Sequence, residues 1–245
     1  TGHLIERGLV PQIRSLSDAS IGIQGFGDVG ATVAHRFQEA GARIVAVGDS
    51  KGGTYERNGI DLPRLQAHRA DTGGVSGVPG TENLEPGEII GIDCDILVPA
   101  ALETQITSQN APEVKARLIV EGADAPTTPE ADLILAERGV TLVPDILANA
   151  GSVVVGYFEW VQNLENQKWT EDDVGERLQD KMRRAVEHVL LTRTRLIENL
   201  PNYRERWQSV MPDWPEIPPI DIRTAALVVA VDRCHRAALL RGVWP

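Results

Sequence analysis

A glycine-rich run at residues 25–30 is the first feature of the sequence whose spacing points to chemistry. It reads GFGDVG and fits the pattern GxGxxG, which is informative where it follows a buried strand and opens a helix. In that setting the first glycine permits a tight turn, the second lets a pyrophosphate approach the backbone, and the third lets helix and strand pack closely. The helix N–H groups and dipole then attract the anion. The run therefore predicts a dinucleotide site.

Two residues of opposite charge follow about 20 residues further on, where a second strand is expected to end. Asp49 can accept hydrogen bonds from the hydroxyls of an adenosine ribose, which favours NAD. Lys51 can instead pair with the 2′-phosphate of NADP, or it is a solvated loop charge. We therefore expect the cofactor to be NAD or NADP, and the preference stays open.

The elements that must position these residues form a strand, helix and strand unit. Residues 20–24 are short and apolar, as in a buried parallel strand, and lead directly into the glycines. Apolar residues between 29 and 40 recur at helical spacing, and Gly41 ends that pattern as a C-cap. Residues 43–48 supply a second apolar strand that ends at Asp49. The length fits a right-handed crossover between parallel strands.

Strands and helices continue to alternate beyond this unit. Leu62, Leu65 and Ala67 predict a helix, and the Gly- and Pro-rich stretch 73–87 is typical of a loop. Further strands are expected at 94–98, 118–120 and 141–143, and a helix at 129–138 with Gly139 just past its end. The alternation indicates an α/β fold with a Rossmann-like, doubly wound, mostly parallel sheet.

After Asn149 the pattern changes to long helices without a convincing strand. The helices are expected at 153–164, 171–200 and 221–241, with Trp214, Pro215, Pro218 and Pro219 as a linker that cannot continue a helix. We therefore expect a Rossmann-type NAD(P)-binding domain at residues 1–150 and a helical extension at 151–245 that packs on it.

Composition and charge exclude several classes of function. The 35 acidic residues outnumber the 24 basic ones, so the formal net charge is −11, and an acidic surface repels nucleic acid. No apolar run approaches the roughly 20 residues that span a bilayer, and the first residues show no signal-peptide pattern. We expect no nucleic-acid partner, no membrane insertion and a cytoplasmic location.

Cysteines and histidines show no pattern of a disulfide framework or a metal site. Cys94 and Cys234 are isolated, and both are expected to be buried thiols in a reducing compartment. The five histidines are scattered without HxH or HExxH spacing, so no metal site is expected.

Six segments resemble, nearly word for word and in the same order, the glutamate dehydrogenases and their leucine, phenylalanine and valine relatives. They are GFGDVG at 25–30, DSKGG at 49–53, CDILVPAALE at 94–103, VEGADAPTTPEAD at 120–132, VPDILANAGSVVVGYFEW at 143–160 and DIRTAALVVAVDR at 221–233. The first twenty residues and the stretch 73–87 match weakly. By this resemblance the chain is identified as a member of that family, and YFEW and the last segment favour the glutamate branch.

The resemblance implies that residues 25–30 bind the pyrophosphate, that residues 49–51 bind the adenosine ribose, and that the other candidates line the cleft toward the nicotinamide. The candidate cofactor-binding residues are Gly25, Phe26, Gly27, Asp28, Val29, Gly30, Asp49, Ser50, Lys51, Ala100, Ala101, Asp124 and Asn149. The Asn149 amide can donate and accept toward a carboxamide, or Asn149 is a helix N-cap, and both roles can hold at once. Thr1 corresponds to a family threonine at the carboxamide.

Three residues depart from the family pattern, and the family also has an asparagine near Thr104. Asp28 and Asp124 stand where the family commonly has asparagine, and Gly156 where it has a serine that contacts substrate. A negative charge at residue 28 beside a pyrophosphate costs on the order of 1 kcal/mol, which predicts weakened cofactor binding. Gly156 removes a hydroxyl from the expected site of the substrate's distal carboxylate.

No catalytic residue is assigned in this chain. The resemblance places the catalytic lysine and its partner aspartate in a substrate domain that precedes the segment seen here. Lys115, Lys168 and Lys181 lie in patterns typical of exposed loop or helix, so none is assigned that role. We expect this chain by itself to bind cofactor without turnover.

The resemblance implies an NAD(P)-dependent amino acid dehydrogenase, which in the intact protein converts L-glutamate reversibly to 2-oxoglutarate and ammonia. The extension would form part of a hinge, and the full-length protein would be a homo-oligomer, a hexamer. Two alternatives stay open. One is a non-catalytic regulatory paralogue, which Asp28, Asp124 and Gly156 suggest. The other is a dehydrogenase for another L-amino acid.

Overall fold

The computed structural model describes residues 1–211 and 219–242 and divides the chain into two compact units. Unit 1 comprises Thr1–Asn149, and unit 2 comprises Ala150–Pro245. Trp214, Pro215 and Pro218 of the expected linker lie outside the described residues.

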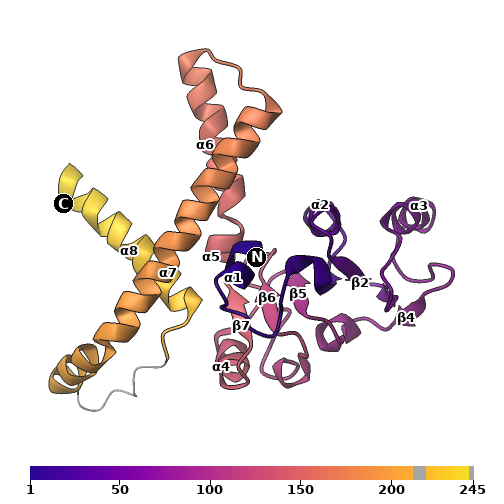
Figure 1. The fold of residues 1–245 in the computed structure, drawn as a ribbon, viewed down its shortest axis with the longest axis horizontal. Helices are drawn as coiled ribbons and strands as arrows, with labels where there is room; N and C mark the ends of the chain where they lie inside the picture. The colour runs from indigo at the N-terminus through magenta and orange to yellow at the C-terminus, as the bar shows by residue number, and fades with distance from the viewer. Residues whose placement is uncertain (212–218, 243–245) are drawn as a thin grey trace. The chain divides into compact units, whose positions relative to one another are not determined.

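Unit 1 contains a seven-stranded sheet in the order β4-β3-β2-β1-β5-β6-β7 (Figure 1). The strands are β1 (Ser20–Gln24), β2 (Arg43–Asp49), β3 (Gly52–Tyr55), β4 (Glu82–Leu84), β5 (Ile96–Pro99), β6 (Leu118–Val120) and β7 (Thr141–Val143). The pairs from β2 through β1, β5 and β6 to β7 are parallel, and the β2–β3 and β3–β4 pairs are antiparallel. The expected α/β, mostly parallel sheet is confirmed.

The two antiparallel strands correct the sequence analysis. β3 was not expected, and the stretch 73–87 is not all loop, because β4 lies within it. Both strands are short and rich in residues with weak strand propensity, so local pattern does not reveal them. Their hydrogen bonds with β2 and with each other form only when the chain turns back after Asp49. The tertiary pairing therefore overrides the local signal.

The third parallel strand begins later than expected. Residues 94–98 were predicted as strand, but β5 runs from Ile96 to Pro99. The Asp95 carboxylate accepts hydrogen bonds from the backbone N–H and the hydroxyl of Ser20, at 2.8 and 2.7 Å. This side chain holds the start of β5 against the start of β1 before regular pairing begins.

The helices of unit 1 begin and end at identifiable caps. They are α1 (Gly2–Glu6), α2 (Asp28–Glu39), α3 (Leu62–Thr72), α4 (Pro129–Glu137) and α5 (Asp145–Ala148), with short 3-10 turns η1 (Leu16–Asp18), η2 (Glu88–Gly91) and η3 (Ala111–Glu113). Asp61 and Thr128 cap α3 and α4 by accepting from backbone N–H groups, and each helix has a proline at its first or second position. Gly73 ends α3 in a left-handed conformation, φ 74°.

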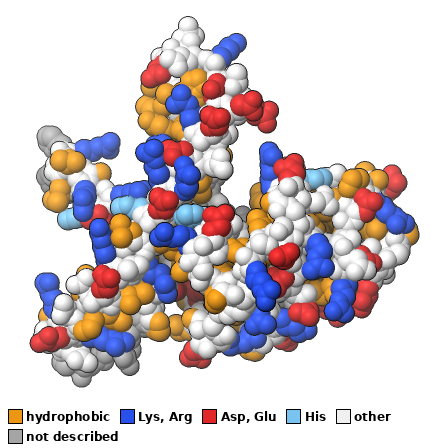
Figure 2. Space-filling model, viewed as in Figure 1, with side chains coloured by type: hydrophobic (Ala, Val, Ile, Leu, Met, Phe, Trp, Pro, Cys, Tyr) orange, Lys and Arg blue, Asp and Glu red, His pale blue; other side chains and the backbone are white. Residues whose placement is uncertain are grey.

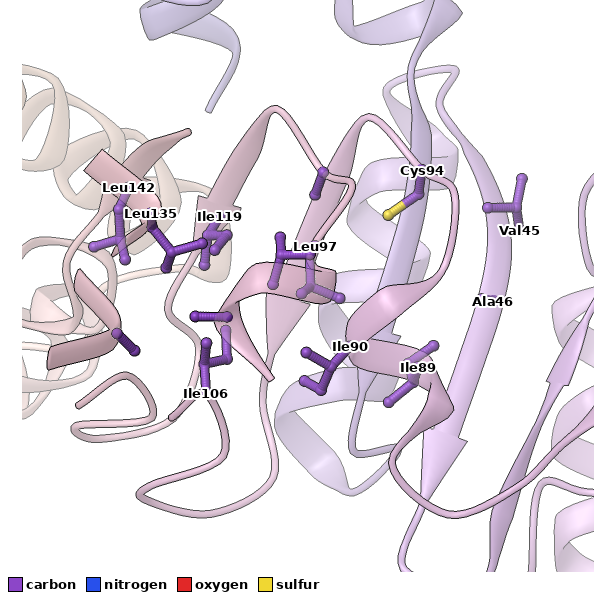
Figure 3. Close-up of a cluster of buried hydrophobic side chains, with 14 of the residues drawn as sticks. Val45, Ala46, Ile89, Ile90, Cys94, Leu97, Ile106, Ile119, Leu135 and Leu142 are labelled. Carbon is purple, nitrogen blue, oxygen red and sulfur yellow. The ribbon is translucent and has the colours of Figure 1, made fainter. Parts of the chain in front are cut away.

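The sheet of unit 1 is covered on both faces. Ile23 points toward α2, since a Cβ added at Gly30 would lie 3.4 Å from its side chain. The neighbouring Gly22 therefore faces the other way, toward Ile92 and Cys94. Figure 3 shows the cluster on that second face, where Ile89 and Ile90 of η2 meet side chains of β2, β5, β6 and β7. The core thus extends across the whole parallel part of the sheet.

Unit 2 consists of α6 (Ala150–Glu165), α7 (Glu171–Val210) and α8 (Ile222–Arg241) among its described residues. α6 packs against α7, and α7 against α8. Thr170 and Asp173 form a capping box at the start of α7. Asp221 caps α8, and the Arg193 guanidinium donates to the Ile220 carbonyl at 3.0 Å, which ties α7 to the start of α8.

One helix of unit 2 is longer than expected. The sequence predicts an end at residue 200, before Pro201, but α7 continues through Pro201 to Val210. Proline removes one backbone donor from the helix, and the residues after it are compatible with helix, so the helix resumes. None of the described helices is long and apolar enough to cross a membrane.

Candidate functional site

The carboxyl ends of the parallel strands bring the candidate residues to one edge of the sheet. β1 lies in the centre, with β2 on one side and β5 on the other, so the strand order reverses at β1. In open α/β sheets a ligand binds at the carboxyl edge beside such a point. The Gly25 N–H donates to the Gly48 carbonyl at 2.6 Å, and the Ala100 N–H donates to the Gln24 carbonyl at 2.7 Å. These bonds join the three loops at the strand ends.

The three glycines of the run meet three different steric requirements. Gly25 has φ 91°, and an added Cβ would lie 2.6 Å from the Ala100 carbonyl oxygen. A Cβ at Gly30 would lie 1.8 Å from the Gly25 carbonyl oxygen. Both positions therefore exclude any side chain. Gly27 differs, because in the described part of the chain no atom lies within 4 Å of its added Cβ.

The space at Gly27 adjoins the N-terminus of α2. Gly27 is the N-cap residue, and no side chain of the described residues caps the helix there. The first N–H groups of α2 therefore keep their capacity to bind an anion. A turn that has no room for a side chain at Gly25 or Gly30, but has free space at Gly27, fits the pyrophosphate of a dinucleotide.

Asp28 and Val29 occupy the first turn of α2, and both are exposed. A carboxylate at a helix N-terminus interacts favourably with the helix dipole. The same carboxylate competes with an incoming anion. The departure noted at residue 28 therefore stabilises the helix without ligand and opposes a pyrophosphate.

Asp49 and Lys51 hold a loop that the sequence analysis did not connect with them. The Asp49 carboxylate accepts from the Lys51 N–H at 2.7 Å and from the Val75 N–H at 3.1 Å. The Lys51 ammonium donates to the Gly73 carbonyl at 3.0 Å. Ser50 lies between them and is exposed. Residues 73–75 are thus part of the candidate site, although their contacts are too distant in sequence for a local pattern to reveal.

Phe26 provides a second link to the same loop. Its ring is buried, and the Arg69 guanidinium of α3 lies over it, 5.8 Å from the ring centroid. Arg69 also carries the carbonyl that accepts from the Gly73 N–H. Sequence reasoning missed Arg69, because nothing in its own helix distinguishes it from the other charged residues of α3.

Ala100 and Ala101 follow β5 directly and pack against the first glycine. The α-carbon of Ala101 would lie 2.8 Å from a Cβ at Gly25. On its other side, the Ala100 methyl would lie 3.1 Å from a Cβ at Gly122. Small residues are needed at both contacts, so these two alanines form a close wall between the loops after β1 and β6.

Asp124 and Asn149 lie together at the far end of this edge. The Asn149 side-chain amide donates to the Asp124 carboxylate at 2.9 Å. Asn149 has helical backbone torsions, φ −89° and ψ −7°, and lies between α5 and α6. These torsions differ from the extended values of an N-cap residue, so the structure does not support the N-cap interpretation.

A buried glutamate supports this pair of residues. The Glu121 carboxylate is fully buried and accepts from the Asp145 N–H at 2.8 Å at the start of α5. The Asp145 carboxylate in turn accepts from the Ala125 N–H at 2.7 Å. These bonds connect the loop that carries Asp124 to α5, the helix whose C-cap is Asn149. Glu121 lies within a segment that the sequence analysis quoted, but it was not singled out.

The sequence also drew attention to three lysines and to Gly156. Lys115, Lys168 and Lys181 are exposed, as expected. Gly156 lies in α6 of unit 2, and no described atom lies within 4 Å of its added Cβ. Over the residues that the structure describes, no group of three potential metal ligands occurs.

The two cysteines differ, which corrects one expectation. Cys94 is buried, and burial raises the pKa of its thiol to about 12. Cys234 was also expected to be buried, but it is exposed on α8. Its position in a helical pattern did not show which face of α8 it occupies.

Comparison with known proteins identifies the family. The family model for glutamate/leucine/phenylalanine/valine dehydrogenases matches residues 4–242. The chain is 42% identical over 228 residues to the glutamate dehydrogenase of Thermotoga maritima, with 93% of this chain and 50% of that protein covered. It is 39% identical over 238 residues to the NAD-specific glutamate dehydrogenase of Staphylococcus aureus, with 97% and 52% covered.

Solved structures agree with the sequence comparison. The hetero-hexameric glutamate dehydrogenase of Thermus thermophilus matches with a TM-score of 0.80 and 32% identity, over 100% of this chain and 53% of that chain. The enzyme of Peptoniphilus asaccharolyticus matches with a TM-score of 0.74 and 30% identity, over 99% and 51%. The chain spans about half the length of the curated relatives that it matches. It belongs to the glutamate/leucine/phenylalanine/valine dehydrogenase family.

Proposed function

We propose that this chain is the NAD(P)-binding half of a glutamate dehydrogenase. In this proposal unit 1 is the dinucleotide-binding domain and unit 2 is its helical extension. The observation that carries the proposal is the glycine turn, which is closed at Gly25 and Gly30 but open at Gly27, beside the uncapped start of α2. The family match and the names of the relatives support it.

Different groups of residues along the sheet edge bind different parts of the cofactor. In the proposal, residues 25–30 bind the pyrophosphate and residues 49–51 face the adenosine ribose. Ala100 and Ala101 form a wall of the cleft. Asp124 and Asn149, which the structure brings within hydrogen-bond distance, face the nicotinamide end. The bound cofactor supplies the acceptor for a hydride from the substrate.

The activity proposed for the intact protein is the reversible conversion of L-glutamate, water and the oxidised cofactor into 2-oxoglutarate, ammonium, the reduced cofactor and a proton. The names of the relatives support glutamate as the substrate. The exposure of Lys115, Lys168 and Lys181 supports a catalytic lysine outside this chain, since a lysine with a lowered pKa needs burial or nearby positive charge. This chain alone therefore binds without turnover. We also propose that the intact protein is cytoplasmic and hexameric.

Gly27→Ala tests the binding site without disturbing the fold. Its φ is −73°, and the added methyl meets no described atom, so the variant folds normally. The methyl would occupy the space assigned to the pyrophosphate. Calorimetric titration with NAD and NADP is expected to show binding to the wild-type chain and at least about a tenfold loss in the variant.

Gly175→Ala is the matched control, because it adds the same methyl in open space on α7. It is expected to bind like the wild type. Absence of binding to the folded wild-type chain would contradict the proposal, as would undiminished binding to Gly27→Ala.

The regulatory paralogue is the second candidate. Asp28 in the first turn of α2 opposes a pyrophosphate, and Gly156 lacks the family's serine hydroxyl. The Thermus thermophilus relative is described as hetero-hexameric, which supports mixed assemblies within this family. Asp28→Asn separates the candidates. If the wild-type chain binds neither cofactor and the variant binds one, the regulatory function is favoured.

A different amino acid substrate is the other alternative, and Gly156 motivates it. The space at Gly156 admits a serine, so Gly156→Ser restores the family's hydroxyl without a clash in unit 2. In the intact enzyme this variant should lower the KM for glutamate if glutamate is the substrate. An unchanged KM for glutamate, with turnover of a branched-chain or aromatic amino acid, would favour the alternative.

A further inference from the structure

Two cationic side chains lie at the C-terminal turn of α3, one bonded to the Gly73 carbonyl and one over the Phe26 ring. Lys51 reaches the Gly73 carbonyl from the turn after β2. Arg69 lies over the ring of Phe26, which follows β1 by two residues. The Gly73 N–H donates to the Arg69 carbonyl, so one helix turn lies next to both cations. The two positive groups therefore flank the edge where Asp49 ends β2.

Neither cation is neutralised by a carboxylate. Within residues 1–211 and 219–242, Lys51 and Arg69 form no ion pair, whereas Arg36, Arg184 and Arg236 each pair with an acidic residue in their own helix. Both side chains are exposed. The formal net charge of the chain is −11, yet these two cations lie at the sheet edge without a carboxylate partner among the described residues. This charge is available to an anionic ligand.

The Asp49 carboxylate at this edge already accepts hydrogen bonds from backbone N–H groups. The two oxygens of Asp49 accept from the N–H groups of Lys51 and Val75, at 2.7 and 3.1 Å. These bonds draw the carboxylate toward the loop and partly compensate its charge. A free carboxylate at this position would repel a phosphate on the neighbouring ribose. In this structure Asp49 instead fixes the loop that places Lys51.

Arg69 is also held in position before any ligand arrives. Phe26 is 2% exposed, so its ring is a fixed surface for the guanidinium. Restricting the guanidinium in advance lowers the entropy cost of binding. Its planar donors match the oxygens of a phosphate.

We propose that Lys51 and Arg69 bind the 2′-phosphate of the adenosine ribose, so that this site selects NADP over NAD. The inference rests on the proposed function, because it specifies which dinucleotide the same edge accepts. It assigns Asp49 the role of positioning the loop at residues 73–75, and it makes Arg69 a specificity-determining residue. The glutamate dehydrogenase relatives include both NADP-specific and NAD-specific enzymes, so family membership does not decide the preference.

Calorimetric titration of the wild-type chain with NADP, NAD, adenosine 2′,5′-bisphosphate and adenosine 5′-monophosphate tests the preference. NADP is expected to bind at least about tenfold more tightly than NAD, and the bisphosphate more tightly than the monophosphate by a similar factor. The preference should weaken as salt concentration rises, because exposed charges are screened. The two mononucleotides isolate the ribose site from the nicotinamide end.

Arg69→Gln and Lys51→Gln assign the effect to residues. Each is expected to weaken NADP binding about tenfold, and Arg69→Gln, which lies outside the residues assigned to the ribose, to leave NAD binding within about twofold. Lys51→Gln is expected to weaken NADP binding more than NAD binding. In Lys51→Gln the loop keeps the hydrogen bond from the Val75 N–H to the Asp49 carboxylate. Arg64→Gln is the matched control, since Arg64 is an exposed arginine on the same helix and its removal changes the net charge equally.

The outcomes separate this inference from the function on which it rests. NAD binding as tight as NADP binding in the wild type overturns the inference and leaves the dinucleotide site intact. An equal loss of both cofactors in Arg69→Gln, or an equal effect of Arg64→Gln, also overturns it. Binding of neither cofactor to the folded chain overturns the proposed function as well.

Discussion

The two units differ in how completely they bury their apolar side chains. Unit 1 encloses a core on both faces of its sheet, and few of its large apolar side chains are exposed. In unit 2 many are exposed, among them Val153, Tyr157, Trp160 and Leu164, whose spacing places them on one face of α6. Figure 2 shows hydrophobic side chains gathered on the hairpin of α6 and α7. A sheet closed by helices on both faces provides its own core, whereas three long helices bury only a narrow strip of each.

This difference matters for function, because binding at the sheet edge requires a rigid frame. The candidate residues of unit 1 are joined by backbone hydrogen bonds between loops, as at Gly25 and Ala100. In unit 2 the residue discussed for substrate binding is Gly156, and the helices around it expose many apolar side chains. We therefore expect stability to depend most on unit 1, and the following variants test that expectation from the largest effect to the smallest.

Gly30→Ala is expected to have the largest effect. Its methyl would lie 1.8 Å from the Gly25 carbonyl oxygen, so α2 must move away from β1. We expect a loss of about 4 kcal/mol or more in unfolding free energy, together with loss of cofactor binding. Urea unfolding followed by circular dichroism measures the first, and titration the second. Gly27→Ala should lose cofactor binding but keep its unfolding free energy. Equal unfolding free energies of the two variants would show that the backbone at Gly30 can move to accept a methyl group.

Leu97→Ala compares the core of unit 1 directly with the surface of unit 2. Leu97 is fully buried in the cluster of Figure 3, so its truncation should cost about 2–5 kcal/mol. Leu164→Ala removes the same atoms from a side chain that is 66% exposed, and should change stability by less than about 0.5 kcal/mol. Equal losses in urea unfolding would show that the exposed face of α6 is covered in solution.

The capping box at the start of α7 should have an intermediate effect. Thr170→Ala removes the hydroxyl that accepts from the Asp173 N–H, and is expected to cost about 1 kcal/mol. Thermal unfolding measures the change, and Thr194→Ser, which keeps a hydroxyl on the same helix, is the control. A loss no larger than that of the control would mean that the end of α7 frays in the native state.

The same cap predicts a dependence on pH. Hydrogen bonds from the Thr170 side chain and backbone lower the pKa of Asp173 below its usual 3.8. A carboxyl whose pKa is lower in the folded state stabilises that state above its unfolded pKa, and this contribution is lost as pH falls through the folded pKa. The stability difference between wild type and Asp173→Asn should therefore be constant near neutral pH, begin to fall near pH 3.8, and be lost as pH falls through the lower pKa of the folded state. A difference that persists at lower pH would contradict the role of the carboxylate.

The smallest effect concerns the two thiols. Cys234 is exposed in unit 2, and Cys94 is buried in unit 1 with a pKa raised to about 12 by burial. A thiol reagent at pH 8 should label Cys234 rapidly and Cys94 only on unfolding, with no change in stability. Cys234→Ser is the control and should abolish the rapid phase. Rapid labelling of both cysteines would show that the core of unit 1 opens readily.

Local features could be predicted because neighbouring residues determine them. The apolar runs of β1 and β2, the glycine spacing at residues 25–30 and Gly139 just past the end of α4 each act within a few positions, and the structure agrees with all of them. The family could be predicted as well, because segments typical of it occur almost unchanged in this sequence.

Tertiary structure decided the features that join distant segments. β3 and β4 exist because their backbones find partners across the sheet, and α7 runs through Pro201 where proline alone suggested an end. The placement of Arg69 over Phe26 and of Val75 on Asp49 depends on where α3 ends relative to β1 and β2. Such contacts carry no local periodicity, because each depends on the path of the chain between the two residues. The sequence determined that a dinucleotide site is expected here, and only the folded chain shows which charges surround it.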